Sequence, residues 1–383
     1  MRQGTGGTAW NGVRRAVRAP VGVAAAAAIA TAAACGGGGD GGVGIITQPP
    51  PAPTATQYVN PVLDSDFPDP AVVRASDGAY YAYATQTTGL RIQVSRSPDL
   101  VAWSPPVEAL ASKPVWTSAT SNYFAPDVQL REGRYVMYYS AQADTTAGAY
   151  CIGVAESTAP LGPFQDVGRP LVCGTGRNNG DFTTIDPQGF DDPQTGRRYL
   201  YWGSGFAPLV VRELAADRRS FAPGSAPVTV AVPRPGNDPS AYDVALIEAP
   251  WVTYRAPHYY MYFSGNACCG TGAHYAVMVA RGSSPTGPFE VLRSGAAARP
   301  ILVGQGRWQN PGHNAVITDA AGAEWMLYHA ISSTNPFLIP GRTDISRRPM
   351  LLDRITYDAA GWPVVGEAGV PTSTPQTRPT TSP

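Results

Sequence analysis

The stretch VQLREGRYVMYYS (residues 128–140) contains the pattern that decides the fold. A short apolar strand, a polar turn with glycine and a second strand dense in tyrosine are typical of an antiparallel hairpin. An isolated hairpin is marginally stable in water, because it buries too little apolar surface. The fold therefore depends on whether the same pattern recurs elsewhere in the chain.

The pattern recurs in four further stretches, which are AVVRASDGAYYAY (71–83), GFDDPQTGRRYLYWGS (189–204), WVTYRAPHYYMYFS (251–264) and AVITDAAGAEWMLYH (315–329). Their matching tyrosines are 55 to 66 residues apart and are Tyr83, Tyr138, Tyr201, Tyr262 and Tyr328. This period exceeds that of helical repeats and suits a blade of four strands. We predict an all-β fold, a five-bladed β-propeller over residues 58–370. A β-sandwich is the alternative, but that fold does not require the same strand–turn–strand pattern to occur five times.

The composition excludes some functions and is compatible with this fold. The 383 residues include 42 Gly and 38 Pro, which indicates many turns. The 28 Lys+Arg balance the 28 Asp+Glu. A neutral chain without a basic surface excess argues against nucleic acid as a partner.

The two ends of the chain differ from the repeats in composition. Three arginines precede an apolar run at residues 21–34, which is too short to span a bilayer and is typical of an export signal. We predict a lipoprotein-type signal peptide over residues 1–35, with Cys35 as the lipidated residue and the only membrane contact. Cleavage just before Cys35 without lipidation, giving a secreted protein, is the alternative. Residues 36–57 are rich in Gly and Pro and are predicted to be a tether, and residues 371–383 a disordered tail.

The remaining cysteines suit an oxidising compartment. Without Cys35 their number is even, as expected for disulfides. We predict a disulfide between Cys151, which opens a strand-like segment, and Cys173, which follows the next one. Cys268 and Cys269 are adjacent, and either a vicinal disulfide or two packed thiols is compatible with the sequence. No CxxC spacing suggests a structural zinc site.

A short polar motif precedes each first strand, and its acidic or imidazole residues are 58 to 65 apart. These residues are Asp69, Asp127, Asp186, Glu248 and His313. Equivalent positions of radially arranged blades converge on the central axis, so we expect one ring at one mouth of the channel. Clustered carboxylates without a nucleophilic Ser or Cys partner suit glycoside hydrolysis. The chain contains no GxSxG, phosphate-loop or HExxH motif that would indicate another chemistry.

These motifs carry a resemblance to a known family. The segments FPDP (67–70), FAPD (124–127), IDPQ (185–188), EAPW (248–251) and GHN (312–314) resemble, in order and spacing, those of glycoside hydrolase family 43. The likeness covers about residues 60 to 367. It implies a five-bladed propeller and an inverting hydrolase of polysaccharides or oligosaccharides that contain arabinose or xylose. It also implies that the chemistry needs no cofactor.

Carried over motif by motif, the resemblance implies a role for each carboxylate. Asp69 is similar to the general base that activates water, and Glu248 to the general acid. Asp186 is similar to a third carboxylate that orients Glu248 and keeps its pKa high. The chain departs from the family at Ala249, where glycine is usual.

Further residues are expected to bind the sugar or a metal. We assign substrate binding to Phe67, Phe124, Asp127 and Arg348, with Arg347 as the alternative to its neighbour. His313 is similar to a central histidine that ligates Ca²⁺ or a water cluster in some members of the family, and a structural histidine is the alternative. His329, inside an aromatic strand, is expected to pack in the core or lie at the surface.

The sequence thus predicts an exported, monomeric glycosidase that acts on arabinose-containing chains as an α-L-arabinofuranosidase or an arabinan endo-1,5-α-L-arabinosidase. Two alternatives stay open, a β-xylosidase and a glycan-binding propeller without activity. All three catalytic positions are occupied by carboxylates, which favours the enzyme. Arabinose versus xylose specificity and endo versus exo action have no readable signal.

Overall fold

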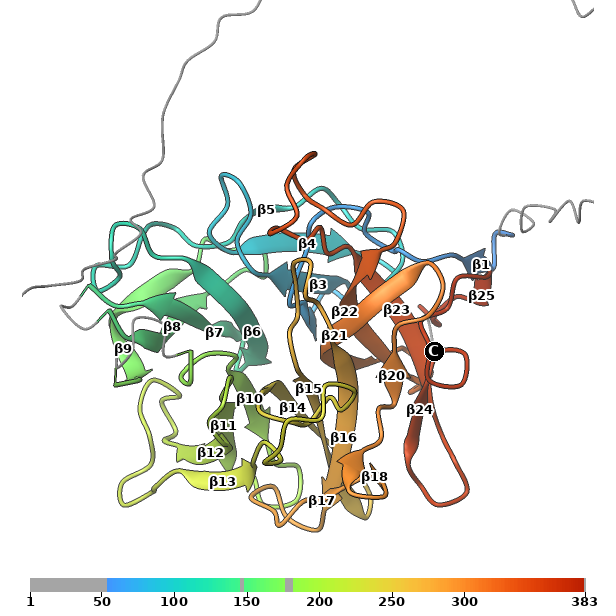
Figure 1. The fold of residues 1–383 in the computed structure, drawn as a ribbon. Helices are drawn as coiled ribbons and strands as arrows, with labels where there is room; N and C mark the ends of the chain where they lie inside the picture. The colour runs from blue at the N-terminus through green and yellow to red at the C-terminus, as the bar shows by residue number, and fades with distance from the viewer. Residues whose placement is uncertain (1–53, 145–147, 176–181, 382–383) are drawn as a thin grey trace, which may run out of the picture. The chain divides into compact units, whose positions relative to one another are not determined.

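The computed structural model describes residues 54–144, 148–175 and 182–381, and these residues form β-strands without a helix. Figure 1 shows five antiparallel sheets that follow one another around a common centre. The predicted five-bladed β-propeller is confirmed. Within this part of the chain, no helix has the length and apolar character needed to cross a bilayer. Cys35 and the predicted signal peptide lie outside the described residues.

Each blade is a meander of consecutive strands. The first contains β2 (Ala71–Arg74), β3 (Tyr80–Ala84), β4 (Gln93–Ser97) and β5 (Val107–Glu108). The second contains β6 (Tyr123–Arg131), β7 (Arg134–Gln142), β8 (Tyr150–Ser157) and β9 (Gln165–Cys173). The third contains β10 (Gln188–Asp191), β11 (Arg198–Trp202), β12 (Leu209–Leu214) and β13 (Val228–Ala231). The fourth contains β14 (Ile247–Arg255), β15 (His258–Gly265), β16 (Ala276–Gly282), β17 (Glu290–Val291) and β20 (Leu302–Val303), which also pairs with β16. The fifth contains β21 (Trp308–Thr318), β22 (Glu324–Ser332), β23 (Met350–Tyr357) and β24 (Pro363–Val365). A small hairpin of β18 (Arg293–Ser294) and β19 (Ala297–Ala298) follows β17.

The apolar core lies between the blades rather than in one central mass. Five clusters of buried side chains each combine residues of two neighbouring blades, and one of them joins the fifth blade to the first. The tyrosine-rich second strands are buried on both faces, as in β3, where all five residues are buried. Each blade therefore buries both of its faces only when its two neighbours are present.

The repeated tyrosines connect one blade to the next. The rings of all five are fully buried, and three of the hydroxyl groups donate to backbone carbonyls of the following blade. Tyr83 donates to Pro160 O at 2.5 Å and Tyr138 to Arg218 O at 3.0 Å, while Tyr201 donates to Pro285 O. A tyrosine supplies a large apolar surface with one polar end, so these three residues fill the interface and also hydrogen-bond across it.

The two ends of the described chain close the ring. β1 (Gln57–Tyr58) pairs with β25 (Gln376–Thr377), and Arg378 forms an ion pair with Asp99 at 2.9 Å. The prediction of a disordered tail over residues 371–383 is therefore wrong for residues 371–381, and the tether prediction is wrong at Gln57. The tail is ordered because its backbone hydrogen bonds are satisfied by the propeller, which its Pro- and Thr-rich composition does not reveal.

Removing residues 371–383 is expected to lower the thermal unfolding midpoint by roughly 5 °C, because β25 and the Arg378–Asp99 pair contribute hydrogen bonds of about 1 kcal/mol each. Circular dichroism during heating measures the midpoint. A chain that ends at Thr381 is the matched control and should unfold like the full chain. An unchanged midpoint in the longer deletion would show that the β1–β25 pairing and the Arg378–Asp99 ion pair contribute no stability.

Both cysteine pairs of the described chain form disulfides. Cys151 in β8 and Cys173 in β9 are opposite one another in the strand register, with their Cα atoms 4.0 Å apart. The predicted pair is confirmed. Cys268 and Cys269 are also bonded to one another, which answers the question that the sequence left open.

Candidate active site

One residue at the start of each first strand has left-handed backbone geometry. The φ angles are 57° at Asp69, 42° at Ala125, 60° at Asp186, 57° at Ala249 and 48° at His313. Such a conformation costs on the order of 1–3 kcal/mol for a residue with a side chain and is typical of functional sites. The positive φ at position 249 shows why glycine would suit this position, because glycine adopts positive φ without the conformational cost that Ala249 has.

This geometry corrects the alignment of the five motifs. The residues that match Asp69 and Asp186 in the second and fourth blades are Ala125 and Ala249, not Asp127 and Glu248. Glu248 lies one residue before the matching position, and Asp127 lies two residues after it. The backbone bulge between Phe124 and Asp127, and its counterpart after Glu248, produce this offset.

Side chains from the end of each second strand hold the left-handed residues of the next blade. Thr85 Oγ1 accepts from Ala125 N at 2.8 Å, Ser140 Oγ from Asp186 N at 3.0 Å, Ser264 Oγ from His313 N at 2.8 Å and His329 Nδ1 from Asp69 N at 3.1 Å. Between the third and fourth blades, Ser204 Oγ donates to Glu248 Oε2 at 2.7 Å instead. These contacts run through all five blade interfaces, so the strained backbone is supported by the closed ring.

A pocket of about 890 Å³ opens at this mouth of the propeller. Five of its lining residues carry ionisable side chains, namely Asp69, Asp186, Glu248, His313 and Arg348. Its apolar lining includes Phe124, Phe182, Phe206 and the pair Cys268–Cys269. An apolar pocket with a few convergent polar groups is the expected form of a small-ligand site. Its size and lining suit a sugar, which has apolar faces and polar edges.

Asp69 lies at the bottom of the pocket among cations and hydroxyl donors. Burial alone would raise its pKa, but the positive charge of the Arg348 guanidinium, at 3.1 Å from Oδ1, is the largest influence that lowers it, and that pKa stays well below its usual value. Thr85 Oγ1 donates to Asp69 Oδ2 at 2.5 Å. Asp69 is therefore an ionised carboxylate at neutral pH, the state that a general base requires.

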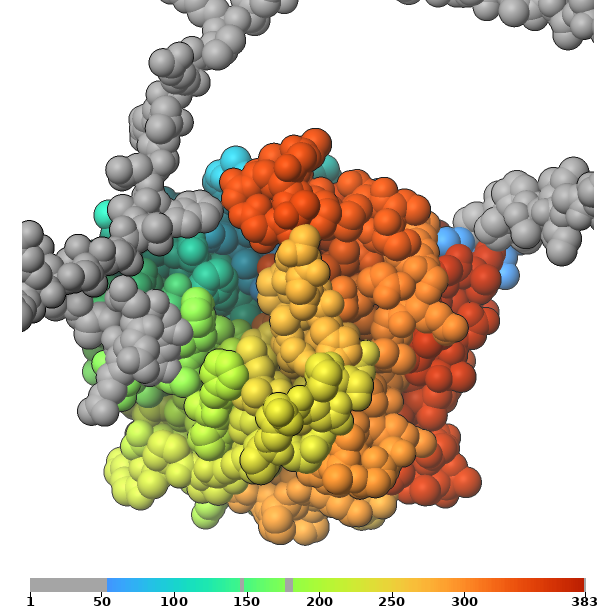
Figure 2. Space-filling view, in the orientation of Figure 1, coloured from blue at the N-terminus to red at the C-terminus, as the bar shows by residue number. Residues whose placement is uncertain are grey.

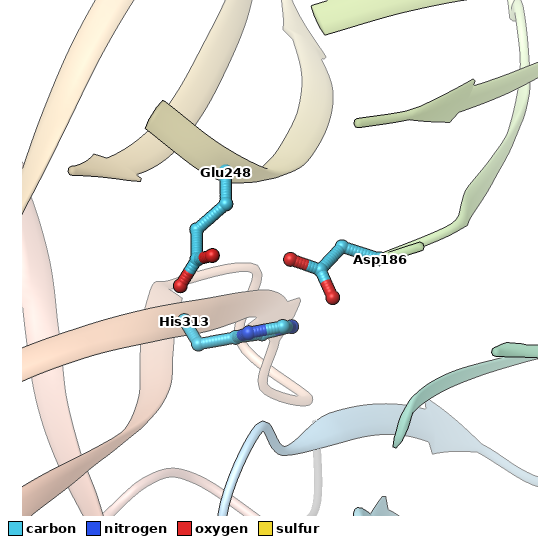
Figure 3. A group of neighbouring side chains, drawn as sticks. All are labelled: Asp186, Glu248 and His313. Atoms are coloured by element: carbon cyan, nitrogen blue, oxygen red, sulfur yellow. The ribbon is translucent and has the colours of Figure 1, made fainter. Parts of the chain in front are cut away.

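Asp186 and Glu248 approach one another from neighbouring blades, with the His313 ring beside both (Figure 3). One side-chain oxygen or nitrogen of each of the three lies within 4.8 Å of the others. Burial, followed by the negative charges of Glu248 and Asp69, raises the pKa of Asp186 well above its usual value. Negative charges held this close oppose one another, so the ionised form of Asp186 is disfavoured.

Two hydroxyl groups fix the Glu248 side chain. Tyr275 donates to Oε1 at 2.6 Å and Ser204 to Oε2 at 2.7 Å. Burial, together with the charge of Glu248, raises the pKa of Tyr275 well above its usual value, so this hydroxyl stays protonated. Both carboxyl oxygens are thus positioned at the pocket wall, where a proton can pass to a bound ligand.

Two of the residues predicted to bind substrate line the pocket. Phe124 forms part of the wall, with its ring centroid 5.8 Å from that of Tyr150. Arg348 reaches Asp69 at the bottom. Its neighbour Arg347 instead pairs with Asp64 near the surface at 2.6 Å, so the structure places Arg348 rather than Arg347 in the pocket.

Phe67 does not line the pocket, and its predicted role in substrate binding is wrong. The ring is fully buried between the first and fifth blades, in one cluster with Tyr80 and Leu100. Its backbone N–H donates to Arg348 O at 3.0 Å. Phe67 therefore supports the chain beside the site, because its ring packs in the core between the two blades.

Asp127 is also outside the pocket, and its predicted role in substrate binding is wrong. The residue is 3% exposed, and its Oδ2 accepts from Gly189 N at 2.8 Å. The bulge after Phe124 moves Asp127 along β6, away from the mouth, so it borders a separate hollow with Gln129 and Arg131. The carboxyl connects the second blade to the third.

The buried Asp127 predicts a pH-dependent stability. Burial raises its pKa from 3.8 to about 7. An acid with a higher pKa in the folded state stabilises the fold below its unfolded pKa, and this contribution is lost as pH rises through the folded pKa. We expect a loss of about 4 kcal/mol in unfolding free energy between pH 4 and pH 8, which Asp127→Asn removes. Urea unfolding across this range measures the slope, with Glu290→Gln, an exposed acid, as control; equal slopes in wild type and Asp127→Asn would contradict the assignment.

Sequence reasoning missed the residues that hold the site. Thr85, Ser204, Tyr275 and His329 contact the carboxylates or their backbone but do not belong to the motifs before the first strands. Three of them follow or end a tyrosine-rich strand, a signal that repeats in the sequence. His329 is buried in the core as one of the expected alternatives, and burial lowers its pKa to about 4, so the ring is neutral and accepts from Asp69 N.

Comparison with known proteins agrees with this geometry. The chain is 26% identical over 320 residues to an extracellular exo-α-(1→5)-L-arabinofuranosidase of Cellvibrio japonicus strain Ueda107, which covers 79% of this chain and 87% of that protein. It is 28% identical over 310 residues to an extracellular endo-α-(1→5)-L-arabinanase of Bacillus subtilis strain 168, covering 77% and 86%.

A solved structure and a family model extend the comparison. The crystal structure of a thermostable family-43 glycoside hydrolase superposes with a TM-score of 0.68 at 27% identity, over 84% of this chain and 99% of the other. The model of glycosyl hydrolases family 43 matches residues 58–363, which include strands of all five blades. The resemblance read from the sequence is confirmed, and the chain belongs to glycosyl hydrolases family 43.

Proposed function

We propose that this protein is a glycosidase that hydrolyses α-1,5-linked L-arabinofuranosyl chains of arabinan. The observation that carries the proposal is the pocket that brings together Asp69, whose pKa is held low, and the neighbouring carboxyl groups of Asp186 and Glu248. One group able to accept a proton and one able to donate it are the minimum for glycoside hydrolysis. The names of the two curated relatives refer to α-(1→5)-L-arabinose linkages, which supports arabinose over xylose.

In this mechanism Asp69 removes a proton from water, and Glu248 protonates the departing glycosidic oxygen. Asp186 lies beside Glu248 and orients it, and the charge of Arg348 keeps Asp69 ionised. Since the base acts through a water rather than on the sugar itself, hydrolysis inverts the anomeric configuration.

The test is hydrolysis of debranched arabinan, arabinohexaose, an aryl α-L-arabinofuranoside and an aryl β-D-xyloside by the purified protein. We expect release of arabinose or short arabino-oligosaccharides, and product sizes over time separate exo from endo action. Proton NMR of the first product reports the anomer. Hydrolysis of the xyloside alone would replace the proposal by the β-xylosidase, and inactivity on all four, with binding retained, by a glycan-binding propeller.

We propose that the protein is exported, since both curated relatives are described as extracellular. Lipidation of Cys35 is a finer proposal that depends on the sequence alone. Labelling with a fatty-acid probe in the producing cells tests it, with Cys35→Ser as control. Equal labelling of wild type and variant would exclude the lipid anchor.

We further propose that one Ca²⁺ ion binds at the centre of the ring, at His313. A cavity of about 10 Å³ lies there, bordered by Asp69, Asp186, His313 and Asn314 among others. This volume suits one water or ion. Within the described part of the chain, neither side-chain polar atom of the buried Asn314 has a hydrogen-bond partner. Carboxylate and amide oxygens are ligands that Ca²⁺ prefers, so the residues fit the ion.

Calcium removal is expected to lower the thermal unfolding midpoint by several degrees, because a bound ion stabilises the folded state by mass action. Unfolding with EDTA, and after re-addition of Ca²⁺ or Mg²⁺, measures the effect, and elemental analysis measures the metal content. An EDTA-insensitive midpoint and no retained metal would leave His313 as a structural histidine.

A further inference from the structure

The two adjacent cysteines of the fourth blade lie in the wall of the active-site pocket. Cys268 and Cys269 are bonded to one another, and both line the pocket. Cys268 is partly buried and Cys269 is exposed. The catalytic scheme above gives this disulfide no task. Its place in the wall, rather than in the core, is the first observation that requires an explanation.

The loop that carries the disulfide is held on both sides. At its base Asn266 Oδ1 accepts from Ala267 N at 2.8 Å, and Asn266 Nδ2 lies 3.0 Å from the His274 ring. On the far side Gly270 N donates to Ser346 Oγ at 2.7 Å, in the segment before β23. In Figure 2 the golden loop between β15 and β16 and this red-orange segment project side by side from the face. The disulfide therefore presents a defined surface to the pocket.

The loop rises from the blade that carries the proposed general acid. Glu248 in β14 pairs with Ser264 in β15, and Asn266 N donates to Leu246 O at 3.0 Å, where Leu246 also lines the pocket. The general acid protonates the oxygen of the leaving group. The departing sugar thus lies on the side of the pocket that this blade forms.

The pocket surface on this side is apolar. A disulfide is polarisable and a weak hydrogen-bond partner, so it contacts C–H groups rather than hydroxyl groups. Phe206, from the third blade, lines the same pocket and is 80% exposed. Large apolar groups that remain exposed inside a pocket mark a binding surface.

We propose that the Cys268–Cys269 disulfide is a sugar-contacting surface that binds the apolar face of the arabinofuranosyl residue on the leaving-group side of the cleaved bond. The proposal rests on the proposed arabinan hydrolysis and adds to it a binding site for the leaving sugar. The disulfide joins two neighbouring residues, so it closes no loop of the chain and serves the pocket rather than the fold.

The test compares wild type with the double variant Cys268→Ala/Cys269→Ala on arabinohexaose. We expect KM to rise about tenfold, the size of effect that one lost apolar contact produces, while kcat changes less than twofold. Titration of arabinohexaose into the inactive Glu248→Gln background should show the same loss in affinity. Ser346→Ala is the matched control, because it removes the support of Gly270 and leaves the disulfide in place.

A reductant offers a second, reversible measurement. Reduction should raise KM of the wild type toward that of the double variant, reoxidation should restore it, and the double variant should not respond. If the double variant does not fold, this measurement decides. An unchanged KM in an active double variant, or an equal rise in Ser346→Ala, would overturn the proposal. A wild type inactive on all arabinosides would overturn it together with the proposed function.

Discussion

Glu248→Gln is expected to lower kcat/KM on arabino-oligosaccharides by about 10²–10⁴-fold, the usual contribution of a general acid. Glutamine has the same shape and keeps the contacts with Ser204 and Tyr275. It has no acidic proton to give to the leaving oxygen. A dinitrophenyl arabinofuranoside should lose far less activity, since dinitrophenolate departs without protonation. Steady-state kinetics on the two substrates measures the contrast.

The control for this variant is Glu290→Gln, which makes the same change in an exposed side chain of β17. It should leave both substrates unaffected. An equal loss on both substrates in Glu248→Gln would contradict the acid role and indicate that Glu248 acts only in binding or structure. Wild-type rates would remove it from the mechanism.

Asp69→Asn is expected to lower kcat by a similar factor of about 10²–10⁴, because asparagine does not remove a proton from water. Here the two substrates should lose equally, since activation of water is independent of the leaving group. The opposite substrate dependence of the two variants separates the base from the acid. Anomer-resolved NMR of the residual product checks that water remains the nucleophile.

Asp127→Asn is the matched control for Asp69→Asn. Both aspartates are buried and both belong to the motifs before the first strands, but only Asp69 lines the pocket. The control should keep wild-type kinetics, and it should lack the loss of stability between pH 4 and pH 8 that is expected for the wild type. A loss of activity in Asp127→Asn comparable with that of Asp69→Asn would contradict the separation of the two residues.

The sequence predicted the propeller because the fold repeats. A tyrosine at the same place in each copy reports an interface between blades that recurs, as Tyr83, Tyr138 and Tyr201 show. The motifs before the first strands also brought Asp69, Asp186 and Glu248 together correctly. In both cases the pattern is local in sequence and occurs once in each blade, and the closed ring brings the copies together.

The wrong predictions of substrate-binding residues occur where a small shift along the chain decides whether a side chain faces the pocket. Phe67 and Asp127 belong to the same motifs as the three carboxylates of the pocket, but Phe67 packs in the core and the bulge in β6 moves Asp127 away from the pocket. The sequence also gave no sign that residues 376–377 pair with 57–58, because a partner more than 300 residues away has no local pattern.

The sequence by itself determined the fold class, the family, the disulfide of Cys151 and the identity of the three carboxylates, because these depend on repeated or contiguous patterns. Only the tertiary structure decided which groups surround them. The low pKa of Asp69, the raised pKa of Asp186 and the contact of Ser204 with Glu248 arise from residues on other blades. Burial and neighbouring charge act through space, so the chemistry of this site exists only when the ring is closed.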